Sequence, residues 1–92
     1  MEIFSKNDQG YLLWLNQNPT GVVINAHNPP NARYLYAHRA SCKTINNNKP
    51  ARGKVWTVKY IKVCGKNLAE VTKWTSDNFD RKPHYCCLCS PD

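Results

Sequence analysis

The 92-residue sequence predicts one α+β domain over residues 1–92, with two helices, a small antiparallel sheet of two to three strands and a cysteine-rich knuckle at the carboxyl end. Three observations lead to this fold class. The length suits a single domain. Runs of β-branched and aromatic residues, typical of strands, are interspersed with two segments of helical spacing. Five cysteines occur in a chain whose small core needs reinforcement, because domains of this size bury a modest share of their surface.

The amino-terminal third predicts a short helix followed by a strand. Asp8 is expected to cap the helix, where its carboxylate meets the positive end of the helix dipole. Apolar residues at helical spacing follow over residues 11–15, and asparagine, proline and glycine over residues 16–21 end the helix. The β-branched run at residues 22–24 then predicts a buried strand.

Two further strands are expected in the middle of the chain. Residues 34–38 predict a strand that forms a hairpin with the first, and its alternation places Tyr34, Tyr36 and His38 on one face. A polar loop over residues 46–53 leads to a third strand over residues 55–64. Because Lys59 and Lys62 fall on opposite faces of a regular strand, we expect a bend or bulge within this third strand.

The second helix has the clearest local signal. Asn67 and Glu70 have the spacing of a capping box, and the apolar residues Leu68, Val71 and Trp74 follow along one helical face. Pro83 is expected to close this helix, and the cysteine-rich segment follows at once.

Two closely spaced pairs of metal-binding residue types predict a zinc site. Cys86 and Cys89 have the Cys-x2-Cys spacing, which brings two thiolates to one ion from a single tight turn. His38 and Cys42, separated by three residues at the expected exit of a strand, supply a second pair. Four such ligands complete the tetrahedron that zinc prefers, with His38 bound as neutral imidazole and its other ring nitrogen held by a neighbouring acceptor.

The remaining cysteines leave alternatives open. Cys64 is a rival to His38 as the fourth ligand, although a lone cysteine is more often a small buried hydrophobe. Cys87 lies inside the Cys-x2-Cys turn and is expected to point away as a spare thiol. The pair Cys86 and Cys89 taken alone would also suit a redox dithiol, although that motif usually begins a helix in a βαβ unit.

The charge is strongly positive and unevenly distributed. The formal net charge is +7, and no acidic residue occurs between Asp8 and Glu70, whereas nine basic residues occur from Arg33 to Lys66. A field of one sign favours a polyanionic partner, although it also promotes solubility. The basic residues expected to contact nucleic acid are Arg33, Arg39, Lys43, Lys49, Arg52, Lys54, Lys59 and Lys62.

The first ten residues contain no apolar stretch like that of a secretory signal, and the longest apolar run, residues 11–15, is too short to cross a membrane. We therefore expect a cytoplasmic protein without a membrane partner. Its thiols would stay reduced there, which favours metal binding over disulfides.

The motif residues resemble those of a known family. His38-Arg39-Ala40-Ser41-Cys42, followed by Cys86-x2-Cys89-x-Pro91-Asp92, is similar to the zinc-binding domain of bacterial Ada-type DNA methylphosphotriester repair proteins and their relatives. The resemblance covers roughly residues 35–92. The whole chain is also similar to a group of uncharacterised small bacterial proteins, through residues 7–8, 11–15, 18–19, 56–57 and 60–64.

The resemblance implies a zinc scaffold and a DNA-facing basic surface. In the repair proteins, the first cysteine of a Cys-x3-Cys pair accepts the methyl group. His38 stands at that position here, and imidazole cannot act as that nucleophile, so methyl transfer by the family route is not expected.

These observations predict a non-catalytic, zinc-stabilised module that binds nucleic acid, with DNA as the expected class. Lysine and arginine would neutralise phosphates, while aromatic residues such as Tyr34, Tyr36 and Tyr60 would stack on unpaired bases. The alternative is a protein-interaction or regulatory adaptor whose basic surface docks an acidic partner. We do not expect an enzyme, because the middle of the chain has no carboxylate pair and the sequence has no glycine-rich phosphate loop and no obvious Ser-His-Asp set.

Overall fold

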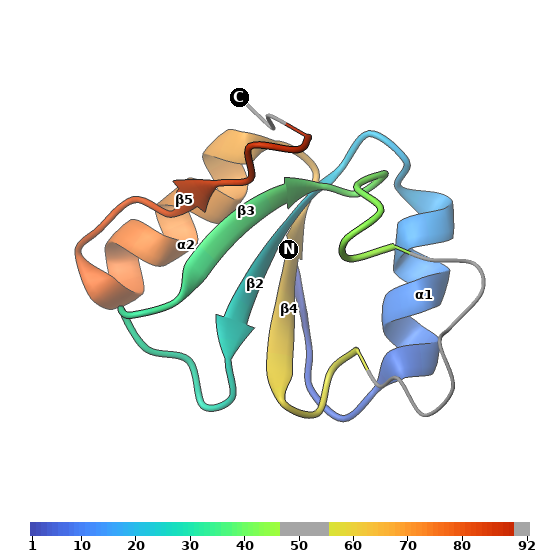
Figure 1. The fold of residues 1–92 in the computed structure, drawn as a ribbon, viewed down its shortest axis with the longest axis horizontal. Coiled ribbons are helices and arrows are strands. Elements are labelled where there is room, and N and C mark those ends of the chain that lie inside the picture. Colours follow the sequence, from blue (N-terminus) through green and yellow to red (C-terminus); the bar gives the residue numbers. More distant parts are fainter. Residues whose placement is uncertain (47–55, 90–92) are drawn as a thin grey trace.

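The computed structural model describes residues 1–46 and 56–89. Its elements, in chain order, are β1 (Glu2–Phe4), α1 (Asp8–Gln17), β2 (Val22–His27), β3 (Leu35–Arg39), β4 (Tyr60–Gly65), α2 (Leu68–Phe79) and β5 (His84–Tyr85) (Figure 1). The α+β class is therefore confirmed. No helix among the described residues has the length and apolar character needed to cross a membrane.

The sheet is larger than the sequence predicted. Five strands in the order β1-β4-β2-β3-β5 form one mixed sheet, and the expected two to three strands were too few. The contacts of β1 with β4, and of β2 with β3 and β4, are antiparallel, whereas β5 pairs in parallel with β3. β1 and β5 have three and two residues, so neither carries an alternating pattern long enough to be read from sequence.

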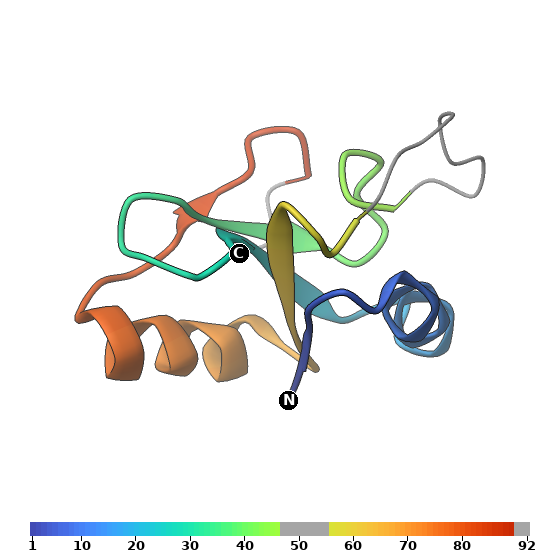
Figure 2. The same cartoon turned by 90° about the horizontal axis from the view of Figure 1, so that it is seen from below.

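The strand pleat divides the core in two. Apolar residues from alternate positions of β2, β3 and β4 pack beneath α2, together with Val71, Leu68, Trp74 and Phe79. Figure 2 shows α2 on one side of the sheet and the turn that follows β5 on the other. The remaining alternate positions include Val23 and Cys64, which pack with Tyr11 and neighbouring residues of α1.

Each helix begins at an asparagine cap, but only the cap of α2 is the residue that the sequence predicted. Asn67 accepts a hydrogen bond from the Glu70 backbone N–H at 2.9 Å, which confirms the expected start of α2. In α1 the cap is Asn7, which accepts from Gly10 N, and not Asp8 as expected. The Asp8 carboxylate is engaged elsewhere, since its two oxygens accept from the backbone N–H groups of Trp56 and Thr57.

Two other boundaries differ from the sequence prediction. Helix α2 ends at Phe79, where Asp80 adopts the left-handed conformation with φ 53°, so the chain leaves the helix before Pro83. The third strand was expected over residues 55–64, but β4 begins at Tyr60, and residues 56–59 form bends. Residue 55 and most of the expected polar loop lie outside the described residues.

Candidate metal centre

The parallel pairing of β5 with β3 brings two distant segments of the chain together. Tyr85 lies opposite Ala37 in the ladder, and the backbone N–H of Cys86 continues it by donating to the Ala37 carbonyl at 2.9 Å. Cys86, which directly follows β5, therefore lies beside His38, which follows Ala37 in β3. This register is what joins the carboxy-terminal Cys-x2-Cys pair to the His-x3-Cys pair.

The turn after β3 folds Cys42 back toward His38. The N–H of Cys42 donates to the carbonyl of Arg39 at 2.9 Å, and the N–H of Ile45 donates to the carbonyl of Cys42 at 3.1 Å. Ala40, the residue after β3, is held by a bond from its N–H to the Gly21 carbonyl at 2.9 Å. These backbone bonds place the Cys42 thiol in a buried position, 5% exposed.

The turn after β5 returns Cys89 to the same place. The backbone N–H of Arg39 donates to Cys89 Sγ at 3.2 Å, and the Arg39 side-chain Nε donates to the Cys89 carbonyl oxygen at 2.7 Å. Backbone N–H donors to cysteine sulfur are typical of Cys-x2-Cys metal turns, because they stabilise the thiolate. Arg39 thus connects the end of β3 to the second cysteine of the pair.

The four side chains together form one cluster of metal-ligating atoms. The ligand atoms of His38, Cys42, Cys86 and Cys89 all lie within 4.8 Å of one another. The Sγ atoms of Cys42 and Cys86 are 4.0 Å apart. A tetrahedral site with metal–sulfur bonds of about 2.3 Å has sulfur–sulfur edges of about 3.8 Å, so the cluster fits an ion after a small contraction.

The other two cysteines lie outside this cluster. Cys64 is fully buried in the core with Val23 and Tyr11, and its Sγ is 3.9 Å from the carbonyl oxygen of Lys62. Burial raises the pKa of the Cys64 thiol well above its ordinary value, which favours the protonated form. Cys87 is exposed.

The environment of the cluster favours the protonation state that a metal requires at two of the four residues, His38 and Cys86. Burial, and then the charge of Lys62, lowers the pKa of His38, which favours neutral imidazole. Burial opposes ionisation of Cys86, but hydrogen bonds from the backbone N–H groups of Leu88 and Cys89 and from the Cys89 and Cys42 thiols together outweigh it and lower the Cys86 pKa. Burial raises the pKa of Cys89 to about 12, so this thiol keeps its proton at neutral pH. A bound cation would displace that proton.

Thr44 completes the surroundings of the cluster and was not identified from the sequence. Its Oγ1 lies 3.1 Å from Cys42 Sγ and 3.3 Å from His38 Nδ1, so one hydroxyl contacts two of the four ligand side chains. Such contacts orient ligands and tune their basicity. A threonine two residues after a candidate cysteine ligand carries no signal in sequence, because its role depends on the turn that folds it back.

The basic residues expected to contact nucleic acid divide into three groups. Arg33, Arg39, Lys43 and Lys59 are exposed. Lys49, Arg52 and Lys54 lie outside the described residues. Lys62 does not belong to the exposed surface: it is 3% exposed, and its Nζ donates to the Trp56 carbonyl at 2.5 Å.

A group of five aromatic rings lies on the sheet face opposite α2, and we call it the aromatic cluster. The His27 ring stacks on Tyr34 at 5.0 Å and on Tyr60 at 5.7 Å between ring centroids. Tyr36 meets Tyr34 edge-on at 4.8 Å and extends the contacts to His84 at 5.3 Å. Four of these side chains are half-buried and His84 is exposed, so the cluster keeps part of its ring surface accessible.

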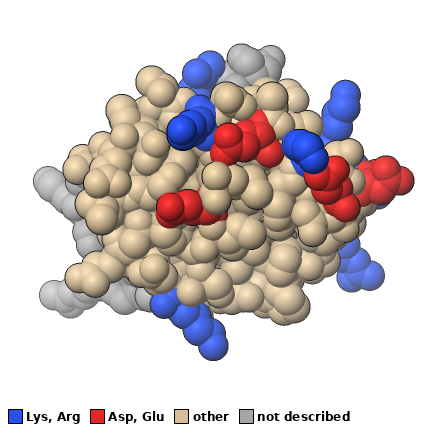
Figure 3. Space-filling view, turned by 180° about the vertical axis from the view of Figure 1, so that it is seen from behind, with Lys and Arg blue, Asp and Glu red and all other residues tan. Residues whose placement is uncertain are grey.

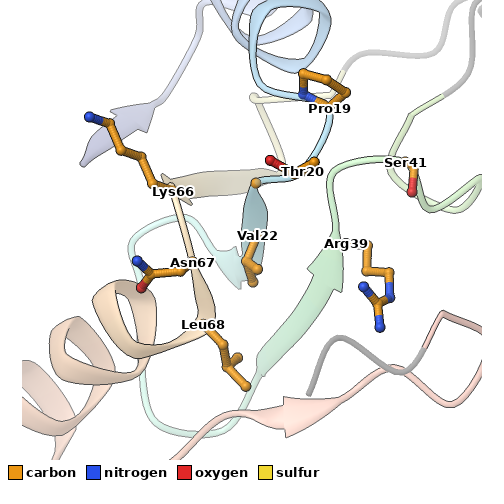
Figure 4. A pocket seen from close by; sticks show the side chains of 9 residues that line it. Pro19, Thr20, Val22, Arg39, Ser41, Lys66, Asn67 and Leu68 are labelled. Atoms are coloured by element: carbon orange, nitrogen blue, oxygen red, sulfur yellow. The ribbon is translucent and has the colours of Figure 1, made fainter.

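A pocket of about 310 Å³ lies between the start of α2 and the end of β3 (Figure 4). Arg39 and Lys66 both line it, but Figure 4 shows the Lys66 side chain extending away from Arg39. The two cations therefore do not converge on one ligand.

No family model, no curated protein and no solved structure matches this chain. The resemblance to Ada-type zinc domains rests on its motif residues alone and stays a prediction.

Proposed function

We propose that this chain is a non-catalytic, zinc-stabilised module that binds nucleic acid, with DNA as the expected class, and that it binds this DNA as a single strand. Three thiols and one imidazole form a soft donor set whose atoms are close enough together to bind one tetrahedral ion. Such a set suits zinc better than the hard cations that prefer oxygen. The four ligands leave no open position for a substrate, so the metal would act as a clasp. It would fasten the end of the chain to β3 and to the turn at residues 40–45.

The observation that carries the nucleic-acid proposal is the aromatic cluster with basic residues beside it. Lys59 Nζ lies 5.8 Å from the centroid of the Tyr60 ring, and Arg33 precedes Tyr34 in the chain. Exposed rings stack on unpaired bases, and neighbouring cations neutralise the phosphates that join them. Aromatic faces serve this purpose without sequence readout, because every base has a π-face.

The distribution of acidic residues supports nucleic-acid binding at the face that carries the aromatic cluster. The described acids lie on β1, on α1, and on α2 with its cap Asp80, and none lies on β2, β3 or β5. Figure 3 shows acidic side chains on the rear face of the molecule, among lysine and arginine residues. A polyanion is therefore repelled least at the face that carries the aromatic cluster.

The proposal is tested by fluorescence anisotropy with a labelled single-stranded oligonucleotide at low and at moderate salt. We expect binding that weakens with salt, with a slope of about −0.7 per phosphate neutralised. Lys59→Ala should remove about one phosphate contact and so make the salt dependence less steep. Lys73→Ala on α2, where the side chain is 76% exposed, should leave the salt dependence unchanged. Absence of binding at low salt, combined with capture of an acidic protein partner, would instead favour the adaptor alternative.

A further inference from the structure

A small pocket lies between the aromatic cluster and the metal centre. Its volume is about 230 Å³, and its lining residues come from three separate segments: Asn25, Thr44, Ile45, Trp56, Lys59, Tyr60 and Lys62. Pockets for drug-sized ligands are larger, at about 300–1,000 Å³. This pocket therefore suits a single flat ring system rather than a whole nucleotide chain.

The sheet register explains how the pocket forms. Asn25 of β2 pairs with Lys62 of β4 on one side and with Tyr36 of β3 on the other, so these three residues cross the sheet in one row. Tyr36 belongs to the aromatic cluster, and three other members of that cluster, His27, Tyr34 and Tyr60, lie to one side of this row. On the other side, the turn with Thr44 and the segment at Trp56 rise above the sheet, which leaves a hollow over Asn25 and Lys62.

Two aromatic residues, Trp56 and Tyr60, and two lysines, Lys59 and Lys62, line the pocket. Lys62 Nζ lies 5.7 Å from the centroid of the Tyr60 ring and 5.8 Å from that of Tyr11. The ammonium group is held there by donation to the Trp56 carbonyl. A positive charge fixed beneath aromatic rings attracts the electronegative carbonyl oxygens and ring nitrogens of a planar heterocycle.

Asn25 provides a polar group that the protein does not fully use. Its Nδ2 makes one long contact, 3.5 Å, with the Tyr34 hydroxyl. Its Oδ1 is buried and has no hydrogen-bond partner among the described residues. An unmade buried hydrogen bond is costly, and the terminal torsion of asparagine turns easily, so a small rotation would let this amide accept from a ligand N–H at the pocket.

From these features we infer that the pocket receives one unstacked nucleobase of the bound strand, with Tyr60 beside its face and with Asn25 and Lys62 at its polar edge. Every nucleobase presents a hydrogen-bond acceptor next to a donor, which matches the cation and the amide oxygen paired across β2 and β4. This inference rests on the proposed function and adds that the protein binds the base itself, not only the sugar-phosphate backbone.

The test compares two labelled strands of equal length, oligothymidylate and an abasic strand with the same phosphates, on the full metal-loaded protein. We expect the base-bearing strand to bind about tenfold more tightly or better. Asn25→Ala should reduce the ratio of the two affinities severalfold and leave the affinity for the abasic strand unchanged. Val58→Ala changes an exposed position in the adjoining bend and is the control, which should keep the affinity ratio of the wild type.

The outcomes separate the two proposals. If neither strand binds, the proposed function fails, and the base pocket fails with it. If both strands bind equally well, nucleic-acid binding stands and the base pocket is overturned. A second measurement does not depend on any variant: NMR titration of the wild-type protein with oligothymidylate should shift the side-chain signals of Asn25 and the indole signal of Trp56. Saturated binding that leaves both signals in place would also overturn the base pocket.

Discussion

The Asp8 carboxylate is the most heavily used polar group at the junction between α1 and the segment before β4. It accepts from Trp56 N and Thr57 N, both at 2.8 Å, and from the Thr57 hydroxyl at 2.6 Å. Thr57 is fully buried and Trp56 is 4% exposed, so both N–H groups would lose their partner in Asp8→Ala. These bonds connect residues nearly fifty positions apart in the chain.

The expected cost of Asp8→Ala is large for a domain of this size. Hydrogen bonds to a charged group contribute about 1.5–3 kcal/mol each, but three bonds to one carboxylate do not add, so we expect about 3 kcal/mol in total. A 92-residue domain has about 5–14 kcal/mol of stability in all. The variant should therefore melt about 12–24 °C below the wild type.

The effect of Asp8 should also depend on pH. Partial burial opposes ionisation, but hydrogen bonds from Thr57 and from the Trp56 N–H, together with the charge of Lys62, outweigh it and lower the Asp8 pKa below 3.8. A carboxylate with a lowered folded-state pKa stabilises the protein above its unfolded pKa of about 4, and this contribution is lost as the pH falls through the folded pKa. The difference in melting temperature between the wild type and Asp8→Ala should thus shrink in acid.

The assay is thermal unfolding followed by circular dichroism, with equal metal loading and several pH values. Asp77→Ala is the matched control, because Asp77 is exposed on α2 and pairs only with the exposed Lys73 among the described residues. Exposed pairs of this kind contribute about 0–1 kcal/mol. An Asp8→Ala variant that melts within about 3 °C of the wild type at neutral pH, or an equal loss in Asp77→Ala, would refute the stabilising role of the Asp8 carboxylate.

Three further substitutions test particular contacts. Asn67→Ala removes the α2 cap and should cost about 1 kcal/mol in urea unfolding, whereas Asn67→Ser should cost much less. Cys64→Ala should keep the metal content of the wild type while lowering stability by about 1–2 kcal/mol, and loss of metal would show that Cys64 is a ligand. Gly21→Ala should destabilise by about 1–3 kcal/mol in the same assay, because its Cβ would lie 2.5 Å from Trp14 Cη2 and 3.0 Å from the Gly65 carbonyl; unchanged stability would mean that Trp14 moves freely.

The local parts of the fold could be predicted from sequence because local residues determine them. The start of α2 follows from Asn67, since a cap needs only the backbone N–H three residues later. The two pairs of candidate metal ligands could be recognised for the same reason, because the two residues of each pair are close together in the sequence. His38 and Cys42 needed only their spacing, as did Cys86 and Cys89.

The parts that depend on distant pairing could not be predicted. β5 consists of His84 and Tyr85 and is a strand only because β3 lies beside it. Lys62 stands among basic residues in the sequence, yet the strand register turns it inward beneath the Tyr60 and Tyr11 rings. The aromatic cluster escaped detection as a unit because its five rings come from four separate segments of the chain.

Elemental analysis of protein purified without chelator is the most direct test of the candidate metal centre. We predict one zinc ion per chain in the wild type, loss of the metal in Cys86→Ala, and full retention in Cys87→Ala, the exposed neighbour in the same turn. Two results would contradict the assignment: wild-type protein that folds without any bound metal, or zinc that is lost in Cys87→Ala but kept in Cys86→Ala.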